Sequence, residues 1–214
     1  MSTVTRLFLV RHGETEWNKD LRYQGHRDIP LSEVGFAQAE KVALRLSKEK
    51  LDAIYSSDLS RAFETAKAIG RFHEAPIKMV RELRETNFGR WEGLTYKEID
   101  QQFKEVMSGW RVNPRDVKIP DGESLGEVRD RCLKGLDKIL SDNPDRNVLV
   151  VAHGGIIRIV VASVLGFEIN DYWKIKQDNV SLNIIDFYGK DKGILSLLND
   201  TCHLDGHLTS KNYV

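Results

Sequence analysis

Residues 148–155 read Val-Leu-Val-Val-Ala-His-Gly-Gly, and this pattern indicates what kind of sheet the chain forms. A run of apolar residues bounded by polar ones is typical of a strand buried on both faces of a parallel sheet. Apolar residues continue to Phe167, but His153, the glycine pair and Arg158 among them are costly or helix-weakening inside a bilayer. The segment therefore predicts a buried strand followed by a buried helix.

Two further short apolar runs, residues 7–10 and 53–55, predict strands of the same sheet. Helical patterns follow them, one after a cap at Ser32 and one after a cap at Asp58 or Ser60. Residues 181–187 and 194–198 predict two closing strands joined by a turn. This order of elements favours an α/β fold with a mostly parallel sheet and helices on both faces.

The middle of the chain has a different pattern. Thr95 and Ser124 each begin a capping box, which predicts a helix running from Thr95 through Trp110 and a second helix from Ser124. We expect residues of about 95–122 to form a small helical insertion beside one edge of the sheet. No linker, repeat or low-complexity segment divides the sequence, so we predict one domain over residues 1–214.

The charge composition indicates which classes of binding partner to expect. The 214 residues carry 32 basic and 32 acidic side chains, scattered along the chain, so we expect neither nucleic-acid nor membrane partners. No secretion signal is visible at the N-terminus. Cys132 and Cys202 lie far apart, outside any metal-binding spacing, so we predict unlinked thiols and a cytoplasmic protein.

Basic and imidazole side chains follow each of the three predicted buried strands. Arg11 and His12 follow the first strand, Arg61 follows the second and His153 follows the third. The carboxyl ends of parallel strands meet at one edge of the sheet, where ligands bind. Two guanidiniums and two imidazoles repel each other there unless an anion joins them, and a phosphoryl group matches the arginine fork. An isolated Arg-His pair is an ordinary loop feature, whereas this convergence predicts a phosphate site.

The motifs around these residues resemble the histidine phosphatase superfamily, which contains the cofactor-dependent phosphoglycerate mutases and their phosphatase relatives. The resemblance runs from about residue 7 to about residue 204. It rests on these motifs in order: Leu-Val-Arg11-His12-Gly13-Glu14-Thr15, Asn18, Gln24-Gly25, Leu31-Ser32-Glu33-x-Gly35, Ser56-Ser57-x-Leu59-x-Arg61-Ala62-x-x-Thr65-Ala66, Leu83-x-Glu85-x-x-x-Gly89-x-Trp91-Glu92-Gly93, Gly122-Glu123-Ser124 and Val-Ala-His153-Gly154.

The resemblance implies a catalytic role for five residues. His12 is the nucleophile that forms a phosphohistidine, and Glu85 is the acid that protonates the leaving alkoxide and the base that then activates water. Arg11, Arg61 and His153 hold the phosphoryl oxygens. These side-chain cations do the work of a metal, so the resemblance implies neither a metal ion nor a cofactor.

The resemblance implies substrate contacts for a further set of residues. Asn18 and the Gly154 amide are additional donors to the phosphoryl group, and Gln24 and Gly25 belong to the substrate-binding set. His203 follows the last strand in a tail similar to that of some bacterial phosphatases of this family, and we include it as a substrate-binding candidate. The resemblance then implies a small-molecule phosphate monoester as the binding partner. The oligomeric state is left open, with a homodimer as one possibility because dimers are common among relatives.

Three other functions stay open. A phosphoglycerate mutase resembling this chain has a longer insertion and Arg-His-Tyr after the acidic residue, where this sequence has Thr86-Asn87-Phe88, so a phosphatase is favoured. A non-enzymatic phosphate sensor needs a missing catalytic residue, and none is missing. A metal site lacks support because His12 has no HExxH-type partner. By resemblance the first substrate candidate is α-ribazole 5′-phosphate, followed by phosphoserine, 3-phosphoglycerate or a broad range.

The remaining aromatic residues and histidines give weaker indications of function. Large aromatic side chains more often pack in cores than line pockets. We therefore expect packing roles, with a pocket wall as the alternative, for Trp17, Tyr23, Trp91, Trp110 and Trp173. His26, His73 and His207 match no catalytic pattern, and we expect them to be solvated.

Overall fold

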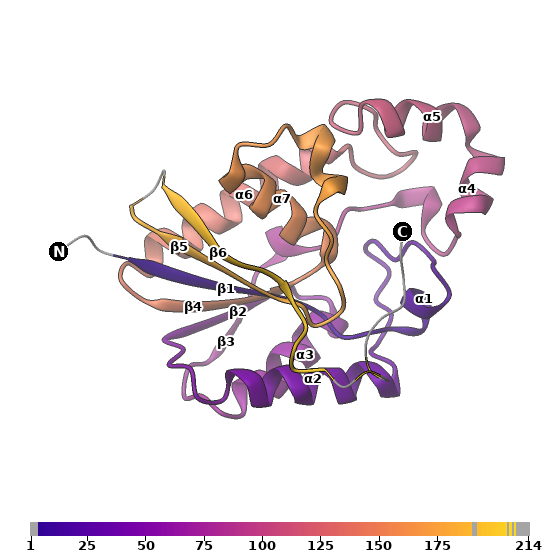
Figure 1. Cartoon of the computed structure of the whole chain (residues 1–214). Helices are drawn as coiled ribbons and strands as arrows, with labels where there is room; N and C mark the ends of the chain where they lie inside the picture. Colours follow the sequence, from indigo (N-terminus) through magenta and orange to yellow (C-terminus); the bar gives the residue numbers. More distant parts are fainter. Residues whose placement is uncertain (1–3, 190–191, 205, 207, 209–214) are drawn as a thin grey trace.

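The structure, a computed structural model, describes residues 4–189, 192–204, 206 and 208. Its strands form a six-stranded sheet in the order β3-β2-β4-β1-β5-β6 (Figure 1). The three apolar runs predicted to be buried strands lie in β2, β4 and β1, which are neighbours in the sheet. The strands are β1 (Thr5–Arg11), β2 (Ala53–Ser56), β3 (Ile77–Met79), β4 (Asn147–Ala152), β5 (Leu182–Phe187) and β6 (Gly193–Asp200).

The sheet is mixed. Strands β1 to β4 pair in parallel, as expected, whereas β5 pairs antiparallel with β1 and β6 antiparallel with β5. The chain before β5 lies at the carboxyl end of β1, where the Val180 amide donates to the His12 carbonyl oxygen. Because β5 begins at the end where β1 finishes, it must run in the opposite direction.

Helices cover both faces of the sheet, which confirms the predicted α/β fold (Figure 1). Alternate residues of β1 point to opposite faces. Leu7 and Leu9 belong to the core shared with α6 and α7, and Phe8 and Val10 to the core shared with α2 and α3. The helices are α1 (Glu16–Lys19), α2 (Glu33–Leu46), α3 (Ser60–Gly70), α4 (Tyr96–Gln102), α5 (Lys104–Val112), α6 (Leu125–Asp142) and α7 (Gly154–Leu165), with short 3₁₀ turns η1 (Arg81–Leu83), η2 (Gly89–Trp91) and η3 (Ile169–Lys174).

Three of the predicted helix caps are confirmed. The Ser32 side chain accepts the Gly35 amide at the start of α2. Thr95 and Ser124 form complete capping boxes at the starts of α4 and α6, in which the glutamate three residues on accepts the cap's own amide.

The predicted cap of α3 is wrong. The N-cap residue is Leu59, whose apolar side chain makes no capping hydrogen bond. Asp58 is engaged elsewhere, because its carboxylate accepts two hydrogen bonds of 2.7 Å from Arg84. The first turn is satisfied from another loop, where Asp28 accepts both the amide and the hydroxyl of Ser60 at 2.8 Å.

The single helix predicted from Thr95 through Trp110 is two helices. Phe103 has φ −130° and ψ 37°, which ends α4 and starts α5 at a new angle. Met107 and Trp110 of α5 are buried in the core on the α6 side. The two helices lie at the carboxyl edge of the sheet, beyond α7 (Figure 1).

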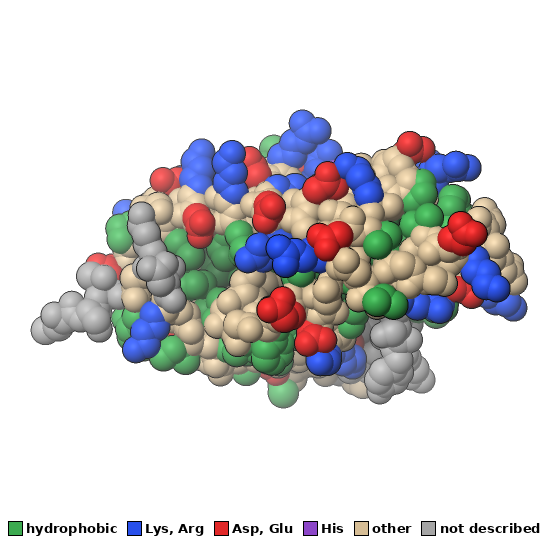
Figure 2. All heavy atoms as spheres, turned by 90° about the horizontal axis from the view of Figure 1, so that it is seen from above, with side chains coloured by type: hydrophobic (Ala, Val, Ile, Leu, Met, Phe, Trp, Pro, Cys, Tyr) green, Lys and Arg blue, Asp and Glu red, His purple; other side chains and the backbone are tan. Residues whose placement is uncertain are grey.

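The surface carries charges of both signs. Figure 2, which views the molecule from above Figure 1, shows acidic and basic side chains interspersed on that face. Within the described ranges no helix is long and apolar enough to span a membrane. Cys132 is buried and Cys202 exposed, and both are free thiols, as expected.

The capping box at Ser124 generates a stability prediction. Replacing Ser124 with Ala removes the acceptor for the Glu127 amide, so the free energy of unfolding should fall by about 1 kcal/mol in urea denaturation. Ser141→Ala, at an exposed position near the other end of α6, is the control and should change it by less than about 0.5 kcal/mol. Equal effects of the two substitutions would contradict a capping role.

Candidate active site

The strand register brings the two predicted histidines together. Arg11 is the last residue of β1 and pairs with Ala152, the last residue of β4. His12 and His153 are therefore the next residues on neighbouring parallel strands, and their ring centroids lie 5.1 Å apart at an interplanar angle of 61°. The sequence-based expectation that these side chains meet at the carboxyl edge is confirmed.

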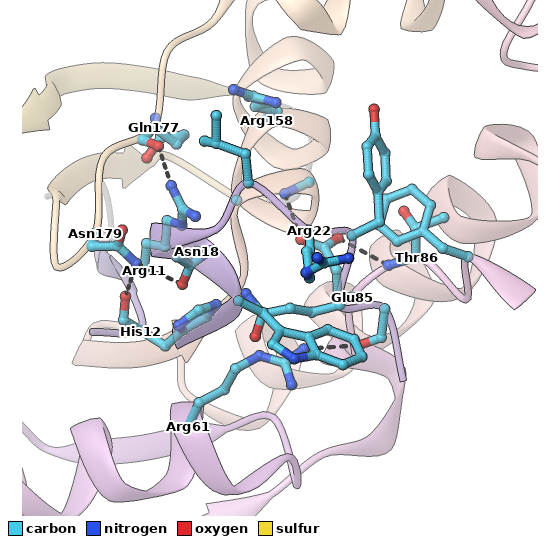
Figure 3. Close-up of a pocket in the computed structure, with 18 of the residues that line it drawn as sticks. Arg11, His12, Asn18, Arg22, Arg61, Glu85, Thr86, Arg158, Gln177 and Asn179 are labelled. Atoms are coloured by element: carbon cyan, nitrogen blue, oxygen red, sulfur yellow. Dashed lines mark hydrogen bonds between the residues drawn. The ribbon is translucent and has the colours of Figure 1, made fainter. Parts of the chain in front are cut away.

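A pocket of about 500 Å³ opens at this edge (Figure 3). His153 is fully buried and lies beside His12 rather than on the pocket wall. Among the residues that the structure describes, His203 is not part of the wall, and its contact with substrate stays a prediction. The predicted site residues that line the pocket are Arg11, His12, Asn18, Gln24, Gly25, Arg61, Glu85 and Gly154.

The ring of His12 is held in one orientation. Its Nδ1 lies 2.7 Å from the Gly13 carbonyl oxygen, so Nδ1–H donates and Nε2 keeps its lone pair. The His12 backbone is held as well, because its carbonyl oxygen accepts the Asn179 side-chain amide at 3.1 Å. Burial, together with the charges of Arg61 and Arg11, lowers the pKa of His12 well below 6.5. The imidazole is therefore neutral at neutral pH, as a nucleophile must be.

Two guanidiniums flank His12, that of Arg61 fully buried and that of Arg11 half-buried. Arg11 donates to the Gln177 carbonyl oxygen at 2.6 Å, and Arg61 donates to the carbonyl oxygens of Gly25 and Arg27 at 2.8 Å. Burial lowers the pKa of each arginine to about 10, so both remain charged at neutral pH. Neither Nε atom has a hydrogen-bond partner in the described part of the chain.

His153 contributes a third nitrogen of this kind. Its Nε2 lies 2.9 Å from the Ser57 hydroxyl, whereas its buried Nδ1 has no partner among the described residues. Burial, and then Arg61, His12 and Arg11, lower the pKa of His153 well below 6.5. Buried polar atoms are almost always hydrogen-bonded in folded proteins. These three unsatisfied nitrogens, two of them in charged guanidiniums, therefore indicate a site built to receive an anion.

Glu85 faces the pocket from the loop between η1 and η2 (Figure 3). Its carboxylate accepts hydrogen bonds from the Thr86 amide at 2.9 Å and the Gly155 amide at 3.0 Å. A side chain at position 155 would collide with this carboxylate, so glycine is required for Glu85 to reach the first turn of α7. The carboxylate is thus fixed beside the strand ends that carry His12 and His153.

Several pocket residues were absent from the sequence-based prediction. Gln177 and Asn179 stand just before β5, and their position at the same sheet edge is the signal that could have found them. Lys176, next to Gln177 in the sequence, also lines the pocket, as do Arg22 and Arg158. These basic residues come from separate segments, and no motif marked them.

The outcome for the aromatic residues is mixed. Trp91 and Trp110 are buried in the core, packed edge to face with centroids 5.6 Å apart. Trp17, Tyr23 and Trp173 line the pocket, which was the alternative expected for them, and Tyr23 also packs against the core as predicted. They come from two segments that lie far apart in the sequence and that only the tertiary fold brings together.

The minor histidines also differ from expectation. His26 is half-buried rather than solvated, and its Nε2 lies 3.0 Å from the Glu85 carbonyl oxygen. His73 is half-buried too, and His207 lies outside the described residues. The described residues contain no group of three or more His, Cys, Asp or Glu side chains arranged to hold a metal ion.

The chain is similar to known proteins over most of its length. The sequence profile of the histidine phosphatase superfamily (branch 1) matches residues 7–201. The chain is 38% identical over 202 residues to phosphoglycerate mutase-like protein 4 of Arabidopsis thaliana, covering 93% of this chain and 86% of that protein. It is 35% identical over 201 residues to phosphoserine phosphatase 1 of Hydrogenobacter thermophilus, covering 94% and 95%. A solved structure described as a putative alpha-ribazole-5′-P phosphatase from Escherichia coli str. K-12 substr. MG1655 superposes with a TM-score of 0.84 at 29% identity, covering 92% and 96%.

The lowered pKa values generate a prediction about protonation. At pH 6.5 an ordinary histidine is half-protonated, whereas His12 and His153 should both be neutral in the folded protein. Since the unfolded chain then binds more protons, both residues make the free energy of unfolding fall as the pH drops through 6.5. ¹⁵N–¹H spectra of the imidazoles check this, with His12→Gln and His153→Gln for assignment and the urea-unfolded chain as reference. Half-protonation of either ring near pH 6.5 would refute it.

Proposed function

This chain belongs to the histidine phosphatase superfamily and is a phosphatase, and we propose that it hydrolyses a small-molecule phosphate monoester through a phosphohistidine at His12. The observation that carries the proposal is the set of unsatisfied buried nitrogens on Arg11, Arg61 and His153 around the neutral His12 ring. A phosphoryl group that enters the pocket beside Arg11, His12 and Arg61 brings three oxygens that can accept from the guanidiniums. The charge of the arginines stabilises the transferring group, which is where phosphoryl transfer obtains most of its catalysis.

In the first half-reaction His12 Nε2 attacks phosphorus in line. The N–P bond forms as the P–O bond to the leaving group breaks, and protonated Glu85 gives its proton to the leaving oxygen. In the second half-reaction Glu85 takes a proton from water, whose oxygen attacks phosphorus. The N–P bond then breaks, which releases inorganic phosphate and restores neutral His12. No step passes through a metal ion or an organic cofactor.

Two features support hydrolysis over phosphoryl transfer back to the product. The chain carries Thr86-Asn87-Phe88 where similar phosphoglycerate mutases carry Arg-His-Tyr, and its helical insertion, α4 and α5, is short. A phosphate-sensing protein without activity is the least supported alternative, because each residue of the proposed mechanism is present.

The first substrate candidate is α-ribazole 5′-phosphate, a nucleotide with a planar benzimidazole base. The pocket volume of about 500 Å³ leaves room for a large leaving group. The outer wall carries aromatic rings on which a planar base can stack, and these are Trp17, Tyr23, Phe88, Tyr96, Tyr172 and Trp173. The solved structure from Escherichia coli supports this candidate by its description.

Phosphoserine is the second candidate. Arg22, Arg158 and Lys176 line the pocket in addition to Arg11 and Arg61, so a substrate carboxylate can meet positive charge there. The relative from Hydrogenobacter thermophilus is named a phosphoserine phosphatase. The proposal also includes a cytoplasmic location, which follows from the cysteine usage, and a homodimer, which follows from the resemblance to the family.

The phosphohistidine is tested by trapping it. Wild-type protein mixed rapidly with ³²P-labelled substrate and quenched in alkali should carry phosphate on His12, and His12→Ala should abolish turnover because the nucleophile is lost. His73→Ala, a half-buried histidine outside the pocket, is the control and should retain wild-type labelling. Label on His153 or on a serine would overturn the assignment.

The two substrate candidates are separated by a panel of monoesters. We expect the highest kcat/KM for α-ribazole 5′-phosphate among that compound, phosphoserine and 3-phosphoglycerate. Trp17→Leu removes a stacking surface, so it should lower kcat/KM for α-ribazole 5′-phosphate by about tenfold and leave that for phosphoserine within about twofold. A preference for phosphoserine that is insensitive to Trp17→Leu and reduced by Arg158→Gln would support the second candidate instead.

A further inference from the structure

Arg131 of α6 bonds to the backbone of the loop that carries Glu85. Its guanidinium donates to the carbonyl oxygens of Glu82 at 2.9 Å, Arg84 at 2.6 Å and Glu85 at 2.7 Å. The side chain is 21% exposed, and Arg131 is not among the residues of the pocket wall. It therefore acts on the loop and not on the substrate.

Glu123 holds Arg131 in this position. The pair is bidentate, with Nε 2.7 Å from Oε1 and the second contact at 2.9 Å. The Glu123 carboxylate also accepts the Asn87 amide at 2.8 Å. Burial raises the pKa of Glu123, but the bonds from Arg131 and Asn87 outweigh it, so the carboxylate stays charged at neutral pH. The Arg131–Glu123 pair thus fixes the loop on both sides of Thr86.

Glu85 is consequently held from two directions. Arg131 and His26 bond its carbonyl oxygen, and the Thr86 and Gly155 amides bond its carboxylate. Proton transfer to a leaving group depends on placing donor and acceptor within hydrogen-bond reach, and small displacements are costly to rate. The planar guanidinium suits this arrangement because its five donors reach five oxygen atoms here, whereas the lysine ammonium has three donors on a single nitrogen.

We propose that Arg131, locked by Glu123, is a positioning residue that sets Glu85 for proton transfer to and from the leaving group and water. The inference rests on the role proposed above for Glu85. It implies that losing the pair impairs the steps that need the proton and spares the binding of the phosphoryl group at Arg11 and Arg61.

The leaving group provides the test. An alkyl phosphate leaves as a basic alkoxide and needs a proton, whereas 4-nitrophenolate leaves without one. In rapid mixing, Arg131→Lys should slow phosphoenzyme formation from the alkyl ester at least about tenfold more than from 4-nitrophenyl phosphate, since general acid catalysis supplies about 10²- to 10⁴-fold. KM and the inhibition constant of vanadate should stay within about twofold. Arg129→Lys, an exposed arginine on the same helix, is the control and should change neither ester.

Three further variants separate the possible failures. Glu123→Gln keeps an acceptor for Asn87 but loses the ion pair, and it should give the same selective loss if Arg131→Lys does not fold. When Glu85→Gln is already present, adding Arg131→Lys should slow phosphoenzyme formation from the alkyl ester by less than a further factor of about two. Equal loss for both esters in Arg131→Lys or Glu123→Gln, or a full additional loss in the double variant, would overturn the positioning role. Equal loss for both esters in Glu85→Gln itself would overturn the proposed function.

Discussion

Parallel pairing of β1 with β4 gives the site its geometry. The register that places Arg11 opposite Ala152 makes His12 and His153 consecutive neighbours at the carboxyl edge. Both strands are buried on both faces, so a shift of one residue would exchange the two cores and move both imidazoles away from the pocket. The same apolar alternation that stabilises the sheet therefore aligns the proposed nucleophile with its neighbour. Arg61 and Glu85 are positioned relative to this pair by α3 and by the loop before η2.

Burial decides the charges at the site. The sequence argument assumed two guanidiniums and two imidazoles in mutual repulsion, but the structure relieves part of that repulsion without an anion. Burial removes the protons from His12 and His153, and the two arginines alone remain charged. The site is then electropositive and has a neutral nucleophile at the same pH. Burial thus supplies the neutral nucleophile, and the high ordinary pKa of arginine keeps the positive charge in spite of burial; attack on a phosphoryl dianion requires both.

Local sequence patterns predicted the strands and helix caps that depend on neighbouring residues. They failed for the features that depend on contacts between distant parts of the chain. The apolar runs at 7–10, 53–55 and 148–152 became strands, the Ser32, Thr95 and Ser124 caps formed, and the resemblance brought together the residues around His12. The cap of α3 was wrong because Asp28, far back in the chain, satisfies Ser60. His26, Tyr23, Trp173 and Arg131 reach the site through tertiary contacts, and no periodicity or spacing in the sequence reports them.

The two ends of the pocket are built from different kinds of structure, regular elements at one end and connecting segments at the other. The phosphoryl end is made by strand ends and first helical turns, which the whole core holds rigid. The outer wall comes from separate surface segments, with Trp17 and Tyr23 on one, Phe88 and Tyr96 on another and Trp173 on a third. Tyr96 and Trp173 are exposed, so these two positions can be replaced without opening a cavity in the core. In evolutionary terms, such a scaffold can acquire a new leaving group by drift in its loops while the bond-breaking chemistry is inherited unchanged.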